Sequence, residues 1–279
     1  MPAPKHRTPR RRRRSTVSWT VSIPILLIGV LVAAIFYAVQ LSRSAYVPTD
    51  SVSLCRTDIA PPAVTVVLLD LTDALSMEEQ IQIGYEFERL RSDMPTHGLF
   101  ELYFLNRDFE SFREPAFSGC NPGDGSEMNS LYQNPELARA RWERDFNNRL
   151  DDAFSAALDL EDSDRSLIME AIRHLSVTPF SNPGYDQSEK ELVIISDLLQ
   201  HNPGMYTQYR VPLESFNEFL SSSYFSQTRT DLRGVDIQLI YLDRHKTRRF
   251  QSRAHIEFWL DYLSHIGGRV QAIKKILGD

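Results

Sequence analysis

The chain has 279 residues, of which 42% are hydrophobic and 24% charged, a composition ordinary for a globular protein. Its formal net charge is −6, but the charge is unevenly distributed: residues 1–44 hold eight basic residues and no acidic one, and the remainder holds 23 basic and 37 acidic residues, a net charge of −14. An acidic body argues against nucleic acid as a partner, because phosphate binding requires positive charge.

The N-terminal segment predicts a membrane anchor. Residues 1–15 form a basic tail, and the apolar segment 16–41 that follows has no charged residue. At 1.5 Å per residue this segment spans the roughly 30 Å hydrocarbon core as a transmembrane helix. Because basic residues stay in the cytoplasm, the N-terminus is predicted to be cytoplasmic and everything after Arg43 periplasmic or extracellular. A cleaved signal peptide is the alternative, but its apolar core would be shorter, about 7–15 residues.

The two cysteines, Cys55 and Cys120, both fall on the exported side of this segment. Exported compartments are often oxidising, so a disulfide between them is predicted. Two buried free thiols are the alternative. The chain has no Asn-x-Ser/Thr glycosylation site, which fits a bacterial inner-membrane protein with a periplasmic domain.

An α/β domain is predicted over residues 63–279, after a polar linker at residues 42–62. The apolar, β-branched run that leads to Asp70 indicates a strand buried on both faces. Ser76 and Glu79 have the spacing of a capping box, which predicts the start of a helix. A second strand is predicted at residues 99–105, from its alternation of apolar and polar residues.

The second half of the domain continues the alternation of strands and helices. A loop rich in turn formers covers residues 107–134, with a short edge strand near residues 113–118, and Asn134-Pro135 marks a helix start. Further strands are predicted at residues 191–196 and 235–242, and further helices after Ser166, around residues 212–222 and over residues 253–277. This order predicts a three-layer, mostly parallel, doubly wound sheet.

Two of the predicted strands end at an aspartate, Asp70 and Asp197. In parallel sheets the ligand site lies beyond the carboxyl ends of the central strands, so the two carboxylates are expected to meet there, with hydroxyls beside them. Oxygen ligands of this kind suit Mg2+ or another divalent cation. The alternative is that these residues cap helices. The predicted ligands are Asp70, Thr72, Ser166 and Asp197, with Asp73 and Ser76 as further candidates.

These parts, in this order, resemble a von Willebrand factor A-like (vWA-like) domain over about residues 63–275. The metal-ion-dependent adhesion site of that family combines Asp-x-Ser/Thr-x-Ser after the first strand, a Thr or Ser before a later helix, and an Asp that ends the central strand. Asp70 and Thr72 match the first motif, Ser166 the second and Asp197 the third.

One position departs from the family pattern. The fifth residue of the first motif is Ala74 instead of serine, so one ligand hydroxyl is missing unless Ser76 or Asp73 replaces it. The resemblance implies a bacterial membrane-anchored binding module that captures a protein partner, whose acidic side chain completes the coordination of the cation. A structural subunit of a membrane assembly, with a degenerate and metal-free site, is the alternative that Ala74 favours.

A metal-assisted hydrolase or phosphatase is a further alternative. A haloacid dehalogenase-like enzyme needs Asp-x-Asp-x-Thr after the first strand, and here Thr72 stands in place of the second aspartate. The chain also has no Gly-x-Ser-x-Gly nucleophile elbow and no glycine-rich phosphate loop. The sequence therefore predicts a binding protein in the inner or plasma membrane, in contact with the bilayer through residues 16–41, and not an enzyme.

Overall fold

The computed structural model describes residues 19–44, 47–106, 111–128, 133–158 and 163–278. The chain divides into two compact units, Met1–Val47 and Pro48–Asp279. In the first unit, helix α1 (Trp19–Ser44) is described, and the side chains of its residues 24–37 are exposed. No helix in the described part of the chain meets the length and apolarity that a membrane crossing requires. The transmembrane segment 16–41 stays a prediction, and the basic tail 1–15 lies outside the described residues.

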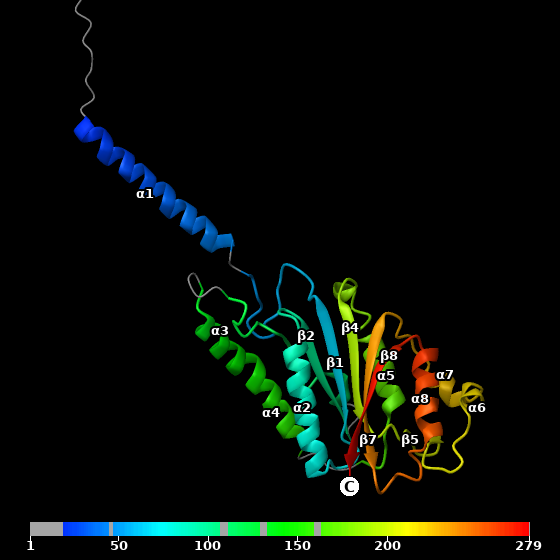
Figure 1. Ribbon diagram of the computed structural model, residues 1–279. Coiled ribbons are helices and arrows are strands. Elements are labelled where there is room, and N and C mark those ends of the chain that lie inside the picture. Colours follow the sequence, from blue (N-terminus) through cyan, green and yellow to red (C-terminus); the bar gives the residue numbers. More distant parts are fainter. Residues whose placement is uncertain (1–18, 45–46, 107–110, 129–132, 159–162, 279) are drawn as a thin grey trace, which may run out of the picture. The chain divides into compact units, whose positions relative to one another are not determined.

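The second unit is built on a six-stranded sheet in the order β3-β2-β1-β4-β7-β8 (Figure 1). The strands are β1 (Ala63–Asp70), β2 (Leu99–Leu105), β3 (Phe117–Cys120), β4 (Glu189–Ser196), β7 (Val235–Arg244) and β8 (Arg269–Gly278). Only β3 runs antiparallel to its neighbour among these strands. The mixed, mostly parallel α/β sheet is therefore confirmed. The strand order reverses between β1 and β4, the place where open α/β sheets bind ligands.

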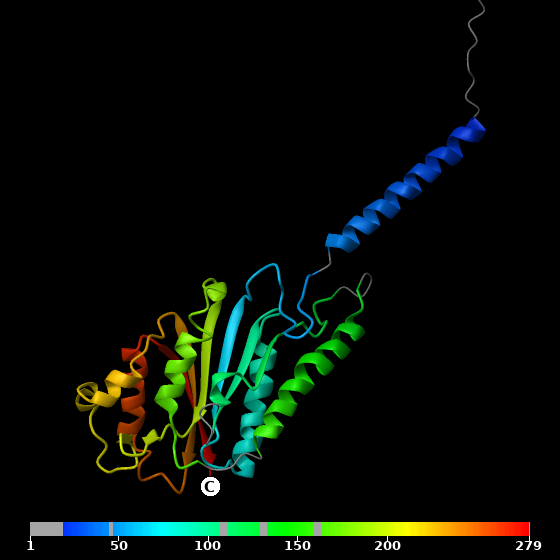
Figure 2. The same cartoon turned by 180° about the vertical axis from the view of Figure 1, so that it is seen from behind.

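Helices cover both faces of the sheet (Figure 2). One face carries α2 (Met77–Asp93) and the continuous segment α3 (Pro135–Trp142), η2 (Glu143–Asn147) and α4 (Asn148–Ala157). The other carries α5 (Ile168–Val177), α6 (Phe216–Leu220), α7 (Ser223–Thr228) and α8 (Arg253–His265). Smaller elements are η1 (Ser111–Arg113), η3 (Pro183–Tyr185) and the hairpin of β5 (His201–Asn202) and β6 (Tyr206–Thr207).

The apolar run in β1 is continuous because both of its faces are buried. Val66 and Leu68 pack in the core beneath α5 and α8, whereas Val67 and Leu69 pack in the core beneath α2 and α4. Alternate side chains of a strand point to opposite faces, so a strand covered on both sides needs apolar residues at every position. This strand carries Asp70 to the edge of the sheet.

Local signals in the sequence set several element boundaries. The predicted capping box at the start of α2 is confirmed: Ser76 Oγ accepts from the Glu79 N–H at 3.3 Å, and the Glu79 carboxylate accepts from the Ser76 N–H at 2.8 Å. Asn134 caps α3, whose first residue is Pro135. Cys55, ahead of β1, forms a disulfide with Cys120 at the end of β3.

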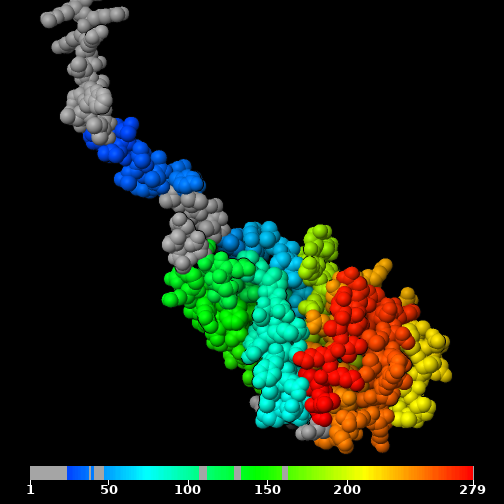
Figure 3. All heavy atoms as spheres, viewed as in Figure 1, coloured from blue at the N-terminus to red at the C-terminus, as the bar shows by residue number. Residues whose placement is uncertain are grey.

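The C-terminal segment contradicts the predicted helix at residues 253–277. Helix α8 ends at His265, and Arg269–Gly278 forms β8, the edge strand beside β7. Gly267 breaks the helix with a φ of +87°, a conformation that glycine adopts without strain. In Figure 3 the last strand lies at the surface beside α2. The helix predicted around residues 212–222 is also wrong in part, since two short helices, α6 and α7, stand there.

Candidate cation site at the carboxyl edge of the sheet

Asp70 is the centre of a group of hydroxyls at the switch point between β1 and β4. Its side chain is buried, and Oδ1 accepts from the Thr72 N–H at 3.1 Å and from Thr72 Oγ1 at 2.7 Å. Oδ2 accepts from Ser196 Oγ at 2.6 Å and from Ser166 Oγ at 3.5 Å. The structure therefore brings Asp70, Thr72 and Ser166 together, and it adds the hydroxyl of Ser196, the last residue of β4.

Asp197 follows β4 and is also buried. Its Oδ1 accepts from the Leu199 N–H at 2.9 Å, but its buried Oδ2 accepts no hydrogen bond from any described residue. Burial, together with the neighbouring Asp70 carboxylate, raises the pKa of Asp197 to about 7, although Arg244 opposes the rise. A buried carboxylate oxygen without a hydrogen-bond donor is costly, because it has lost its hydration and gained no hydrogen bond in return.

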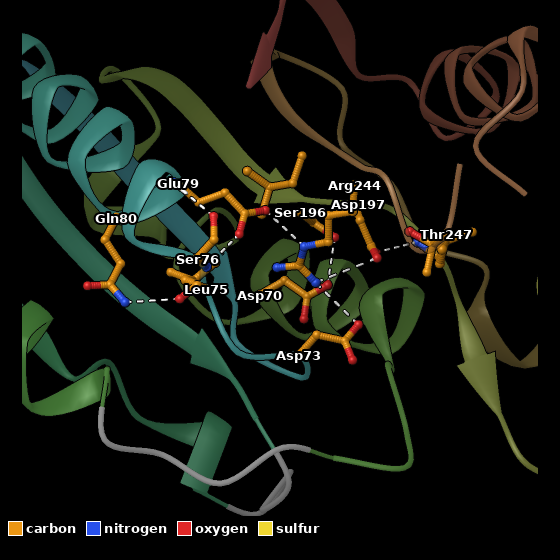
Figure 4. A network of polar contacts seen from close by, with 12 residues as sticks. Asp70, Asp73, Leu75, Ser76, Glu79, Gln80, Ser196, Asp197, Arg244 and Thr247 are labelled. Atoms are coloured by element: carbon orange, nitrogen blue, oxygen red, sulfur yellow. Dashed lines mark hydrogen bonds and ion pairs between the residues drawn. The ribbon is translucent and has the colours of Figure 1, made fainter. Parts of the chain in front are cut away.

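A guanidinium that sequence reasoning missed lies beside these carboxylates. Arg244 ends β7, and its side chain is only 10% exposed. Its Nε donates to Glu79 of α2 at 2.9 Å, its Nη1 donates to Asp73 at 3.2 Å, and Nη1 lies 3.8 Å from Asp197 Oδ2 (Figure 4). Burial by itself lowers the pKa of Arg244, but the carboxylates, Asp197 first, raise it overall, so the group stays charged.

The charges of the site do not balance among the described residues. The side chains of Asp70, Glu79 and Asp197 are each at most 5% exposed, and Arg244 is the buried cation that faces them. Asp73 adds a fourth carboxylate, which is about half exposed. Buried charge without a counter-charge drives uptake of a proton or a cation, because the charged form has lost its hydration.

The oxygen atoms present fit a hard divalent cation. They are carboxylate and hydroxyl oxygens, which Mg2+ prefers, and one of them, Asp197 Oδ2, lacks a donor. In the part of the chain that the structure describes, no group of three or more His, Cys, Asp or Glu side chains is placed to hold a metal ion. A cation here would therefore depend on the hydroxyls of Thr72, Ser166 and Ser196 as well as on the two aspartates.

The two further candidates have other contacts. Asp73 pairs with Arg244, and Ser76 is the N-cap of α2. Ser166 does not cap α5, whose N-cap is Leu167; instead its backbone N–H and C=O pair with those of His201 at 2.9 and 2.8 Å. The backbone pairing fixes the Ser166 hydroxyl against the hairpin of β5 and β6.

Sequence reasoning also did not predict the aromatic side chain of Tyr209 at the rim of the candidate site. Burial raises the pKa of Tyr209, and the carboxylates of Asp197, Asp73 and Asp70 raise it further. The Tyr209 ring packs edge-on against His201, with centroids 5.5 Å apart. No signal in the sequence linked this loop residue to the two strand ends.

No protein-family model and no curated protein matches this chain. Among solved structures it is similar to the conserved hypothetical protein BatB of Bacteroides thetaiotaomicron, with 10% identity, 78% of this chain and 91% of that chain covered, and a TM-score of 0.37. It is also similar to an aerotolerance-related membrane protein of Bacteroides fragilis, with 13% identity, coverage of 64% and 67%, and a TM-score of 0.30. Likenesses this slight carry no argument about function. The sheet itself, by its strand order and its one antiparallel edge, fits a vWA-like fold.

Proposed function

We propose that this chain is a single-pass bacterial membrane protein that presents a vWA-like domain outside the cytoplasm and binds a protein partner at the carboxyl edge of its sheet. Residues 16–41 form the anchor and residues 42–62 the linker. Binding depends on a divalent cation, Mg2+ in the first instance, held by Asp70, Thr72, Ser166, Ser196 and Asp197. An acidic side chain of the partner completes the coordination of the cation.

The observation that carries this proposal is the buried, donorless Oδ2 of Asp197 within an excess of buried negative charge. A bound cation supplies the missing positive charge and lowers the pKa of Asp197. Mg2+ keeps some of its coordination positions for water or for an incoming ligand, which leaves room for a carboxylate of the partner. The proposed activity is therefore capture of a partner.

The test is thermal unfolding of the full chain in detergent, with and without millimolar MgCl2. A ligand at about 100 times its Kd stabilises the folded state by about 2.7 kcal/mol, so the unfolding temperature should rise with Mg2+. Asp197→Asn and Asp70→Asn should abolish the rise. Asp236→Asn, which removes a carboxylate paired with Arg269 away from the site, is the matched control and should keep it. Equal responses in all three variants would refute the cation site.

A second candidate is a structural subunit with a metal-free site, and the ion pairs of Arg244 favour it. In that case Arg244 alone supplies the positive charge of the site. Crosslinking and pull-down from native membranes, with and without EDTA, separates the two candidates. Capture that survives both EDTA and Asp197→Asn supports the structural subunit. Turnover of generic phosphate or ester substrates, lost in Asp70→Asn, would instead replace both with a hydrolase.

A further inference from the structure

The segment between β7 and α8 is basic, although the part of the chain that follows residue 44 is acidic overall. Residues 244–253 hold five Arg or Lys residues, one His and no acidic residue. Residues 245–250, called here the basic turn, extend beyond the carboxyl end of β7, at the end of the sheet that bears the candidate cation site (Figure 1). Four of its side chains are exposed: His245, Lys246, Arg248 and Arg249.

The basic turn is fixed to the strand ends by Gln251, whose side chain is buried. Its Oε1 accepts from the Arg244 N–H at 3.0 Å and from Thr247 Oγ1 at 2.9 Å. Its Nε2 donates to the backbone carbonyls of Leu242 at 2.7 Å and of Asp197 at 3.3 Å. The backbone of the turn therefore stands in a defined position relative to Asp197, so the turn itself needs little ordering when a ligand arrives.

Two of these exposed cations have no ion-pair partner among the described residues. In the described residues, Lys246 and Arg249 have no carboxylate within ion-pair distance, whereas Arg248 shares Asp243 with Lys275, at 3.4 and 3.7 Å. Like charges held together destabilise the folded state unless an anion approaches them. The group is therefore available to an anionic ligand from outside.

An aromatic path connects the basic turn to the cation site. The Arg249 guanidinium lies 4.5 Å from the centre of the Phe250 ring, and that ring packs edge-on against Tyr209 at 5.4 Å. Stacking orients the plane of a guanidinium and leaves its N–H groups free for a carboxylate. Tyr209 in turn packs edge-on against His201, whose backbone pairs with that of Ser166, so the basic turn and the site form neighbouring parts of one surface.

We propose that the basic turn docks an acidic segment of the protein partner, and that it decides which partner is bound and in which register. The proposal deepens the proposed function and rests on it for the neighbouring cation contact. The rest of the domain is acidic overall and repels such a partner, so attraction is expected at this turn and at the neighbouring cation. Complementary charge of this kind gives specificity and faster association more than affinity.

The position of the linker favours a protein over the lipid surface as the occupant. The linker enters at the opposite, amino edge of the sheet, where Cys55 joins the end of β3 and the Pro62 carbonyl accepts from the Glu189 N–H. A strand of eight residues separates the two edges by roughly 26 Å. The basic turn therefore lies at the end of the domain away from the linker that leads to residues 16–41.

The test measures binding of a fluorescent peptide rich in Asp and Glu to the full chain in detergent, by anisotropy at rising NaCl. The Asn/Gln version of the peptide is the control ligand. Wild type should bind the acidic peptide in a salt-sensitive way, and Lys246→Gln/Arg249→Gln should weaken binding about tenfold. Arg144→Gln/Arg233→Gln, which removes two exposed cations elsewhere, matches the change in net charge and should leave binding unchanged.

The outcomes separate this proposal from the cation proposal. If EDTA has no effect but the Lys246/Arg249 variant binds weakly, the basic turn stands and the cation site fails. If EDTA abolishes binding and this variant binds like wild type, the basic turn fails alone. Absence of peptide binding by wild type, or preferential binding to phosphatidylglycerol vesicles through the same two residues, would overturn the proposal of a protein partner.

Discussion

The two edges of the sheet are stabilised by different contacts. At the amino edge, the Cys55–Cys120 disulfide and the Ser188 hydroxyl, which donates to the Pro61 carbonyl at 2.6 Å, join the chain, and the Asp236–Arg269 ion pair is partly exposed. At the carboxyl edge, three buried carboxylates face Arg244, and one buried carboxylate oxygen has no donor among the described residues.

Under the proposed function, the carboxyl edge binds the partner and the amino edge holds the domain together. A disulfide stabilises a fold, whereas unbalanced buried charge costs stability unless a ligand supplies the balance. Variants at the amino edge should therefore change stability alone. Variants at the carboxyl edge should change stability in a way that depends on cations and partners.

The largest effect is expected at Arg244. Arg244→Met should lower the free energy of unfolding by about 3–5 kcal/mol in EDTA, because it leaves the buried carboxylates of Glu79 and Asp197 without a cation. Urea denaturation measures this loss. Millimolar Mg2+ should restore more stability to the variant than to wild type. A variant as stable as wild type in EDTA would show that the buried charges do not form a coupled group.

The corresponding prediction at the amino edge concerns removal of the disulfide. Cys55 and Cys120 are 65 residues apart, so Cys55→Ser/Cys120→Ser should lower the free energy of unfolding by about 4 kcal/mol, because the open unfolded chain gains conformational entropy. The Mg2+-induced rise in unfolding temperature should keep its size. A lost Mg2+ response in this folded variant would contradict the independence of the two edges.

His255, which lies beneath the carboxyl edge, is expected to make the free energy of unfolding depend on pH. Its Nε2 donates to the Leu198 carbonyl at 3.0 Å, and its Nδ1 lies 3.0 Å from the Tyr241 hydroxyl. Burial lowers the pKa of His255 to about 4. The unfolded chain takes up the proton near pH 6.5, so stability is lost as pH falls from about 6.5 to 4, by about 3 kcal/mol at the lower limit.

The measurement for His255 is urea denaturation of wild type and His255→Gln at several pH values across this window. The free energy difference between the two proteins should shrink as the solution is acidified, because the variant has no imidazole to protonate. Parallel pH profiles would mean that the imidazole is already charged in the folded protein or stays accessible to water.

The smallest effect is expected at Ser76. Ser76→Ala should lower the free energy of unfolding by about 1 kcal/mol, because the N-cap of α2 is lost. Thermal unfolding with and without MgCl2 should show an unchanged Mg2+ response, since the Ser76 hydroxyl accepts from the Glu79 N–H. A weaker Mg2+ response in this variant would instead identify Ser76 as a ligand in the place of the serine missing at Ala74.

Local patterns in the sequence predicted most of the strands and helices of the fold. The strand at Leu99–Leu105 has the predicted bounds, and the capping box at Ser76 opens α2. These features depend on neighbours in the chain, through burial on both faces of a strand or a hydrogen bond across one helical turn. The edge strand expected near residues 113–118 is found as β3 at Phe117–Cys120.

The C-terminal segment shows where local patterns fail. Val270, Ile273 and Leu277 recur at a spacing of three or four, which suits a helix, yet all three belong to β8. The pairing that β7 offers at the edge of the sheet decided the outcome, together with the glycine pair at Gly267. A free strand edge is a property of the folded sheet and cannot be read from a window of sequence.

The sequence by itself determined that two aspartates end apolar strands and that hydroxyls stand near them. Tertiary structure decided the rest of the site. The register of β7 beside β4 brings Arg244 against Asp197, and the hairpin of β5 and β6 brings Tyr209 to the rim. The reason is physical: apolar burial leaves a pattern along the chain, whereas the balance of charge in a site depends on distances between residues far apart in sequence.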